Sequence, residues 1–239
     1  MIPTFPEFKK LELSDQNEIE LITSKYAPYS DFDFGNLLCW YGEDQVEISI
    51  LNDNLIITFP DYAKNQKCVS FLGNTKINQT VKVLLNYIQS LGMYEPELRF
   101  IPEESLKDIN MEEYIIEIDF DNSDYVYNLN ELSFYSDHRY AKKRQFANIF
   151  LNRNSNIEVK LLDLRDPNVQ SEVLILYDVW SGNKNGNGEN SYFHKEHHAI
   201  HRLMSYELDN LLCVGVFVNM QLIGYSIFRK LPDHYAICY

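Results

Sequence analysis

The residues best suited to chemistry are four basic side chains within six positions, Arg139, Lys142, Lys143 and Arg144. Residues 138–157 contain five Lys or Arg and no Asp or Glu, whereas the whole chain has a formal net charge of −14. At helical spacing Arg139, Lys142 and Lys143 share a face. Such a cluster suits the phosphates of a cofactor, an RNA or a lipid head group. A solvated helix face, balanced by the acidic first part of the chain, is the alternative.

Four histidines form a second candidate. His194, His197, His198 and His201 follow helical spacing and share one face. Two such histidines can share a zinc ion, but a zinc site needs further ligands that the sequence does not identify. We therefore predict a polar, partly exposed helix face and no metal site.

A Gly/Asn-rich segment, residues 182–188, precedes these histidines. Its backbone amides could meet a phosphate. A phosphate-binding loop follows a strand and opens a helix, and this context is missing. We expect a surface loop.

The motifs of several large enzyme classes are absent. The chain has no GxxxxGK[ST], GxSxG, HExxH or GxGxxG sequence. This disfavours P-loop NTPases, serine hydrolases with a nucleophile elbow, zincins and Rossmann dehydrogenases. No catalytic residue can be assigned from a motif, and the cofactor is unknown.

Composition indicates a folded protein of one large or two small domains. The chain has 239 residues, 45% of them hydrophobic, with 17 Tyr and 14 Phe. Its four cysteines form no CxxC pair and are interpreted as buried thiols. No leader and no apolar run of about 18 residues is present, so we expect a cytoplasmic protein without a membrane span. The acidity argues against nucleic-acid binding by the whole surface.

Hydrophobic periodicity predicts an α+β (mixed α/β) chain with a boundary in the acidic segment 121–127. Before it we expect helices at 14–26, 32–41, 77–91 and 102–109, and strands at 46–50, 55–59, 68–72, 98–101 and 114–120. After it we expect a basic helix at 139–151, helices at 169–180 and 193–208, and strands at 157–162, 211–218, 221–228 and 235–239. The shared order of helix, helix, hairpin and strand favours a duplicated domain, with domains at 1–125 and 126–239.

Three stretches carry a family resemblance: residues 29–40 (YSDFDFGNLLCW), residues 124–132 running on to Tyr140-Ala141-Lys142-Lys143-Arg144, and residues 196–202 (EHHAIHR). Together they resemble a family of uncharacterised bacterial proteins that is similar to the C-terminal domain of phosphatidylglycerol lysyltransferases. The resemblance implies two tandem domains of the GNAT acyltransferase fold, the second apparently truncated. Its third stretch adds Glu196, His198 and Arg202 to the candidate ligand-binding residues.

The resemblance also implies a function: transfer of an acyl or aminoacyl group from a CoA thioester or a charged tRNA to an amine or hydroxyl. The alternative is a non-catalytic module of the same fold that binds an anionic ligand or a partner protein. The place where relatives hold CoA corresponds to residues 72–78, which contain one glycine and make a poor pyrophosphate cradle.

The last residues, 235–239, read as the opening of an apolar strand. We therefore expect an incomplete second domain that is inert alone. Its exposed sheet edge would be a route to oligomerisation. An anionic small molecule or tRNA is the expected partner.

Overall fold

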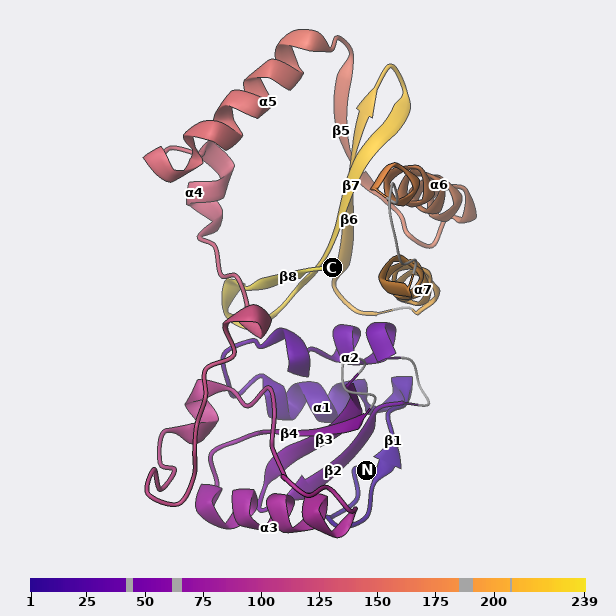
Figure 1. Ribbon diagram of the computed structural model, residues 1–239. Coiled ribbons are helices and arrows are strands. Elements are labelled where there is room, and N and C mark those ends of the chain that lie inside the picture. The colour runs from indigo at the N-terminus through magenta and orange to yellow at the C-terminus, as the bar shows by residue number, and fades with distance from the viewer. Residues whose placement is uncertain (42–44, 62–65, 185–190, 207) are drawn as a thin grey trace. The chain divides into compact units, whose positions relative to one another are not determined.

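The computed structural model describes residues 1–41, 45–61, 66–184, 191–206 and 208–239 (Figure 1). These residues form a mixed α/β structure with two four-stranded antiparallel sheets, so the predicted α/β class is confirmed. The chain divides into two units, Met1–Ser123 with His198–Tyr206, and Asp124–His197 with Glu207–Tyr239.

The sheet of the first unit follows chain order: β1 (Lys9–Lys10), β2 (Glu47–Leu51), β3 (Asn54–Asp61) and β4 (Gln66–Leu72). The predicted hairpin between β2 and β3 is confirmed. Asn52 and Asp53 form its turn with φ of 51° and 63°. Asn and Asp tolerate this left-handed conformation better than other non-glycine residues, so the turn is encoded locally.

Helices cover both faces of this sheet. Figure 1 shows α1 (Gln16–Thr23) and α2 (Phe34–Tyr41) on one side and α3 (Ile77–Ser90) on the other. The apolar stripe of α3 packs on Ile56, Val69 and Phe71 and consists of Ile77, Val81, Leu84 and Ile88. Because helices lie on both sides, every residue from Leu55 to Phe59 is buried.

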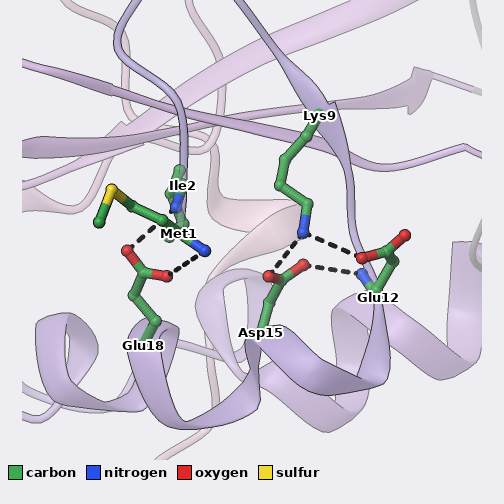
Figure 2. A network of polar contacts seen from close by, with 6 residues as sticks. All are labelled: Met1, Ile2, Lys9, Glu12, Asp15 and Glu18. Atoms are coloured by element: carbon green, nitrogen blue, oxygen red, sulfur yellow. Dashed lines mark hydrogen bonds and ion pairs between the residues drawn. The ribbon is translucent and has the colours of Figure 1, made fainter.

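A polar network fixes the start of α1 (Figure 2). The Asp15 carboxylate is 3% exposed and accepts hydrogen bonds from Lys9 Nζ at 2.8 Å and from the Glu12 amide at 3.0 Å. This hydrogen bond to Asp15 raises the pKa of Lys9. Glu18, one turn along, accepts from the Ile2 amide at 3.0 Å. The Asp15 side chain makes no cap hydrogen bond to α1 and instead closes the short 3-10 turn Leu13–Asp15 that precedes it.

Two predicted strands of the first unit are wrong. Residues 98–101 lie beside β4 with the Arg99 amide 3.3 Å from the Val69 carbonyl oxygen, but they form no ladder. Residues 114–119 alternate between apolar and polar types yet have no regular structure. Ile116 and Ile118 are 38% and 72% exposed. Alternation yields a strand where a neighbouring strand satisfies the backbone, and no strand pairs with this segment among the described residues.

The second unit begins with α4 (Leu129–Phe134) and α5 (Ala141–Arg153). Its sheet again follows chain order: β5 (Ile157–Leu162), β6 (Leu211–Val218), β7 (Gln221–Lys230) and β8 (Ala236–Cys238). The predicted basic helix and the predicted hairpin are confirmed. Asn219 and Met220 form the hairpin turn with φ of 51° and 67°.

Two further helices, α6 (Pro167–Lys184) and α7 (Ser191–Ser205), precede this hairpin. Helix α6 extends beyond its predicted end, so Gly182 and Asn183 are helical rather than part of a loop. The rest of the segment predicted to be a surface loop, residues 185–188, lies outside the described residues. Val173 and Tyr177 are buried, whereas Trp180 is 41% exposed.

The same order of elements occurs in each half of the chain. The first half runs β1-α1-α2-β2-β3-β4 and the second β5-α6-α7-β6-β7-β8. In both sheets the strands pair in chain order and antiparallel. No helix among the described ranges combines the length and the apolar composition needed to cross a bilayer.

Candidate functional site

A carboxylate between two tyrosines is the most distinctive polar arrangement of the second unit. The Tyr177 hydroxyl, on α6, lies 3.0 Å from Glu196 Oε2 and 3.0 Å from the Phe193 carbonyl oxygen. Burial, and then the charge of Glu196, raise the pKa of Tyr225 on β7 to about 12. Glu196 therefore accepts a hydrogen bond from one phenol, and its charge raises the pKa of a second.

The thiol of Cys213, on β6, is linked electrostatically to Tyr225. Burial raises its pKa to about 11, and its charge would in turn raise the pKa of Tyr225. A thiol protonated to this degree is a poor nucleophile, because the thiolate is the reactive form. Cys213 is a packing residue, and Glu196 is the group of this cluster that can take up a proton.

A histidine–aspartate pair lies next to the same tyrosine. His197 Nε2 is 3.5 Å from Asp178 Oδ1, and the His197 ring centroid is 5.7 Å from that of Tyr177. The pair is accessible, with side-chain exposures of 33% and 65%. A histidine beside a carboxylate is a common arrangement for general acid–base chemistry. The second unit thus offers two acid–base groups, Glu196 and His197, on adjacent positions of α7.

The four-histidine face does not form a metal centre in the described part of the chain. No group of three or more His, Cys, Asp or Glu side chains lies close enough to hold a metal ion there. His198 and His201 are exposed and belong to the first unit. The side chain of His194 lies outside the described residues.

Arg202 contacts backbone rather than an open cleft. Its Nε lies 2.5 Å from the Cys39 carbonyl oxygen and its Nη2 lies 3.0 Å from the Trp40 carbonyl oxygen, all within the first unit. Carbonyls in the last turn of a helix have no partner within the helix, and a cation there also favours the helix dipole. Arg202 therefore caps α2, and a ligand-binding role for it stays a prediction.

The basic cluster divides into two pairs. Arg139 is tied to its own neighbourhood, 3.1 Å from Glu131 Oε2 and 3.1 Å from Asp137 Oδ1. Its hydrogen bonds lower the pKa of Asp137. Arg144 donates from Nη1 to the Tyr135 carbonyl oxygen. These two arginines hold the connection from α4 to α5.

Lys142 and Lys143 are exposed, and neither forms an ion pair with an acidic residue in the described part of the chain. Lys142 Nζ lies 5.9 Å from the centroid of the Phe146 ring. Lys142, Phe146, Ile149 and Arg153 follow i, i+4, i+7, i+11 spacing and share one stripe of α5. Phe146 is 57% exposed and no residue of α5 is buried. Cations interleaved with an exposed aromatic ring are typical of surfaces that bind single-stranded nucleic acid.

The loop from β4 to α3, predicted to be a poor pyrophosphate cradle, is filled by the first unit's own side chains. The Gly73 amide donates to Ser105 Oγ at 3.2 Å, and the Thr75 amide donates to Asn54 Oδ1 at 3.0 Å. A Cβ on Gly73 would lie 2.2 Å from Asn54 Oδ1. Two amides that could meet a phosphate are therefore occupied, which confirms that this loop is a poor cradle.

Sequence reasoning found Glu196 but not its neighbours. Tyr177 lies on the buried side of α6, and nothing in the neighbouring sequence reveals that its hydroxyl meets Glu196, 19 positions away. Tyr225 lies in a strand, where its sequence context indicates only a packing role. A buried tyrosine needs a hydrogen-bond partner, and this was the available signal.

Comparisons with known proteins identify a family and a related fold. A family model described as "Phosphatidylglycerol lysyltransferase, C-terminal" matches residues 23–237. The chain is similar to the crystal structure of a conserved protein of unknown function from Bacteroides thetaiotaomicron VPI-5482, with a TM-score of 0.74 and 20% sequence identity over 96% of this chain and 76% of that one. At this identity the likeness concerns the fold alone. The comparison with curated proteins gives no match.

Proposed function

We propose that this chain, which belongs to the family of phosphatidylglycerol lysyltransferase C-terminal domains, is an aminoacyltransferase-like protein. It moves an aminoacyl or acyl group from a charged tRNA or a CoA thioester to an amine or hydroxyl. The family match over residues 23–237 carries this proposal. The acceptor named in the family description, phosphatidylglycerol, offers hydroxyl groups and is the first acceptor to test.

The repeated element order supports a tandem acyltransferase architecture. Each half of the chain runs strand, helix, helix and three further strands. This is the order in which GNAT-type domains begin, and we assign residues 1–125 and 126–239 to two such domains. The filled loop after β4 favours a supporting role for the first domain, so we place the chemistry in the second.

We favour charged tRNA as the donor. Lys142 and Lys143 on α5 offer two exposed cations beside the exposed ring of Phe146, and a polyanion gains from such a stripe through release of counterions. In the first domain a CoA donor would need free loop amides, and those of Gly73 and Thr75 are occupied. Use of charged tRNA would place the reaction in the cytoplasm.

Glu196 is the proposed general base. The acceptor oxygen or nitrogen attacks the aminoacyl carbonyl carbon, and the proton of that acceptor atom moves to the Glu196 carboxylate. The bond from that carbon to the donor oxygen then breaks, and the proton passes to the leaving oxygen. Tyr177 orients the carboxylate through the 3.0 Å hydrogen bond to Oε2. Such a positioned base contributes roughly 10²- to 10⁴-fold to a rate.

The test uses the full chain, lysyl-tRNA, and vesicles containing phosphatidylglycerol. Glu196→Gln should lower the transfer rate by roughly 10²-fold or more while tRNA affinity stays unchanged. The double variant Lys142→Glu, Lys143→Glu should weaken tRNA binding and reduce the steepness of its salt dependence by about 1 for each lysine. Lys25→Glu with Lys82→Glu, two exposed lysines of the first unit, makes the same charge change and should leave tRNA binding unaltered. Equal tRNA binding by the two double variants would contradict the assignment of α5.

The second candidate is a non-catalytic module that binds an anionic ligand or a partner. The observation that favours it is the filled loop of the first unit. It predicts tRNA binding that depends on Lys142 and Lys143 with no aminoacyl transfer from any charged tRNA or CoA thioester. Transfer that is lost in Glu196→Gln excludes it.

A further inference from the structure

The two faces of the β5-β6-β7-β8 sheet differ in how well they are covered. The strand register places Val159 opposite Val216 and Leu161 opposite Val214, so these four side chains share one face. We call it the open face, and it also includes Phe228, whose neighbour in the register is Cys238. On the edge strand Val159 and Leu161 are 65% and 72% exposed. The central strand's residues on this face are half-buried.

The opposite face is closed by packing. Five of its residues on β6 and β7 are buried, namely Cys213, Gly215, Leu222, Ile227 and Arg229, and α6 packs on β7. The space around one glycine on each face shows the difference in covering. A Cβ on Gly215 would lie 2.7 Å from Leu162 Cδ1, whereas a Cβ on Gly224, on the open face, would meet nothing within 4 Å.

The alternation of polar and apolar side chains along β5 indicates which face of the sheet is suited to burial. Glu158 and Lys160 point to the side of α6, where they pair with each other, and Val159 and Leu161 point to the open face. A sheet with one face in water places its polar residues on that face and its apolar ones on the core. β5 does the reverse, and a contiguous apolar face of this kind marks an interaction site.

The first unit shows what covers such a face. There α3 lies on the face formed by Ile56, Val69 and Phe71, in a sheet with the same strand order. The apolar residues of α3 fall at i, i+4, i+7 and i+11, from Ile77 to Ile88. The segment 75–92 contains two lysines and no acidic residue, so the helix that covers this face in the first unit is weakly basic.

We propose that the open face binds a neutral or weakly basic amphipathic helix with this same stripe, lying across β5 to β8 as α3 lies across the first sheet. Helix-on-sheet packing buries both apolar surfaces, and this burial drives the association. The site is distinct from the Glu196 cluster, which involves the covered face.

The test measures fluorescence anisotropy of a labelled synthetic peptide of residues 75–92, titrated with the full chain. The wild-type chain should bind the peptide. Leu161→Glu should weaken binding at least tenfold, because a carboxylate then faces the apolar stripe. Lys160→Glu changes the adjacent, exposed residue on the other face and should bind as the wild type does. A peptide with Val81→Glu and Leu84→Glu should not bind.

Circular dichroism melting of both variants checks that they fold, as expected from their exposed positions on β5. Absence of peptide binding to the wild type, or equal weakening by Leu161→Glu and Lys160→Glu, overturns the proposal. Self-association of the wild type that is lost in Leu161→Glu also overturns the proposal, because a second copy of the chain would then be the occupant. Binding to anionic vesicles that Leu161→Glu abolishes would make a lipid surface the occupant.

Discussion

The pKa of Tyr225 depends on where the side chain lies in the fold, although its type and sequence position suggest only packing. Its pKa rises from 10.0 to about 12, first through burial and then through the charge of Glu196. Burial raises the pKa of Cys213 from 9.0 to about 11 for the same reason. In both groups the folded state holds its proton more tightly than the unfolded state does.

The sign of the pH dependence follows from this difference. Between pH about 9 and about 12 the native state binds more protons than the unfolded state, so the free energy of unfolding falls as pH rises. The contribution is fully present below pH 9 and lost above the folded pKa values. Urea unfolding at a series of alkaline pH values should show this decline.

Glu196→Gln tests the electrostatic part of the shift. Removing the carboxylate charge should lower the pKa of Tyr225 but leave it above 10.0, because burial remains. Ultraviolet absorbance of tyrosinate during an alkaline titration follows the change. The matched control is Glu172→Gln, an exposed residue of α6, which should leave the Tyr225 titration unchanged. A Tyr225 pKa that is the same in Glu196→Gln and the wild type would show that Glu196 is not beside Tyr225.

At the scale of elements, periodicity alone does not make a strand. Residues 55–59 and 114–119 both contain apolar side chains, yet the first are paired on both sides and buried while the second are irregular and largely exposed. Burial raises the pKa of Tyr114, which anchors the start of the segment next to α3's core cluster. Beyond Tyr114, residues 115–119 are all exposed.

Hydrogen exchange measures this contrast. The amides of residues 115–119 should exchange as fast as an unstructured peptide, because no described strand protects them. The amides of Leu55 to Phe59 should be protected by several orders of magnitude, since they lie in a central strand. Hydrogen exchange also tests α5, an exposed helix. Slowed exchange of its amides would show that the helix is formed, and exchange as fast as in an unstructured peptide would show that it is not. Protection of 115–119 equal to that of β3 would show that the segment pairs as a strand in solution.

At the scale of the whole molecule, the two units differ in how much of each sheet is covered. The largest fully buried side chains all belong to the first unit, among them Phe32, Phe34, Phe59 and Phe71. The second sheet has one covered face and one open one. Since apolar burial is the main favourable term in folding, the second unit should be the less stable.

Differential scanning calorimetry of the full chain should therefore show two transitions. Val173→Ala, at a fully buried position of α6, should lower the first transition. Ile56→Ala, in the covered core of the first unit, should lower the second by an amount corresponding to roughly 2–5 kcal/mol. A single transition that both variants shift equally would contradict independent units.

The sequence by itself determined the features whose signals are local. The turns at Asn52-Asp53 and Asn219-Met220, the apolar stripe of α3 and the basic helix α5 depend on residues within a few positions of one another, because helix period, strand alternation and turn conformation are short-range properties. The resemblance carried by three short stretches gave the family, which the match over residues 23–237 confirms.

Only the tertiary structure decided which distant groups meet. Glu196 meets Tyr177 across two helices, and Asn54 fills the loop at Thr75 from 21 positions away. The segment 114–119 lacks a partner strand despite its alternation. Backbone and buried polar groups must find hydrogen-bond partners somewhere, and which partner is available depends on how remote segments pack. The hydrogen-bond partner of each group is therefore set by the fold as a whole and cannot be predicted from the local pattern of residues.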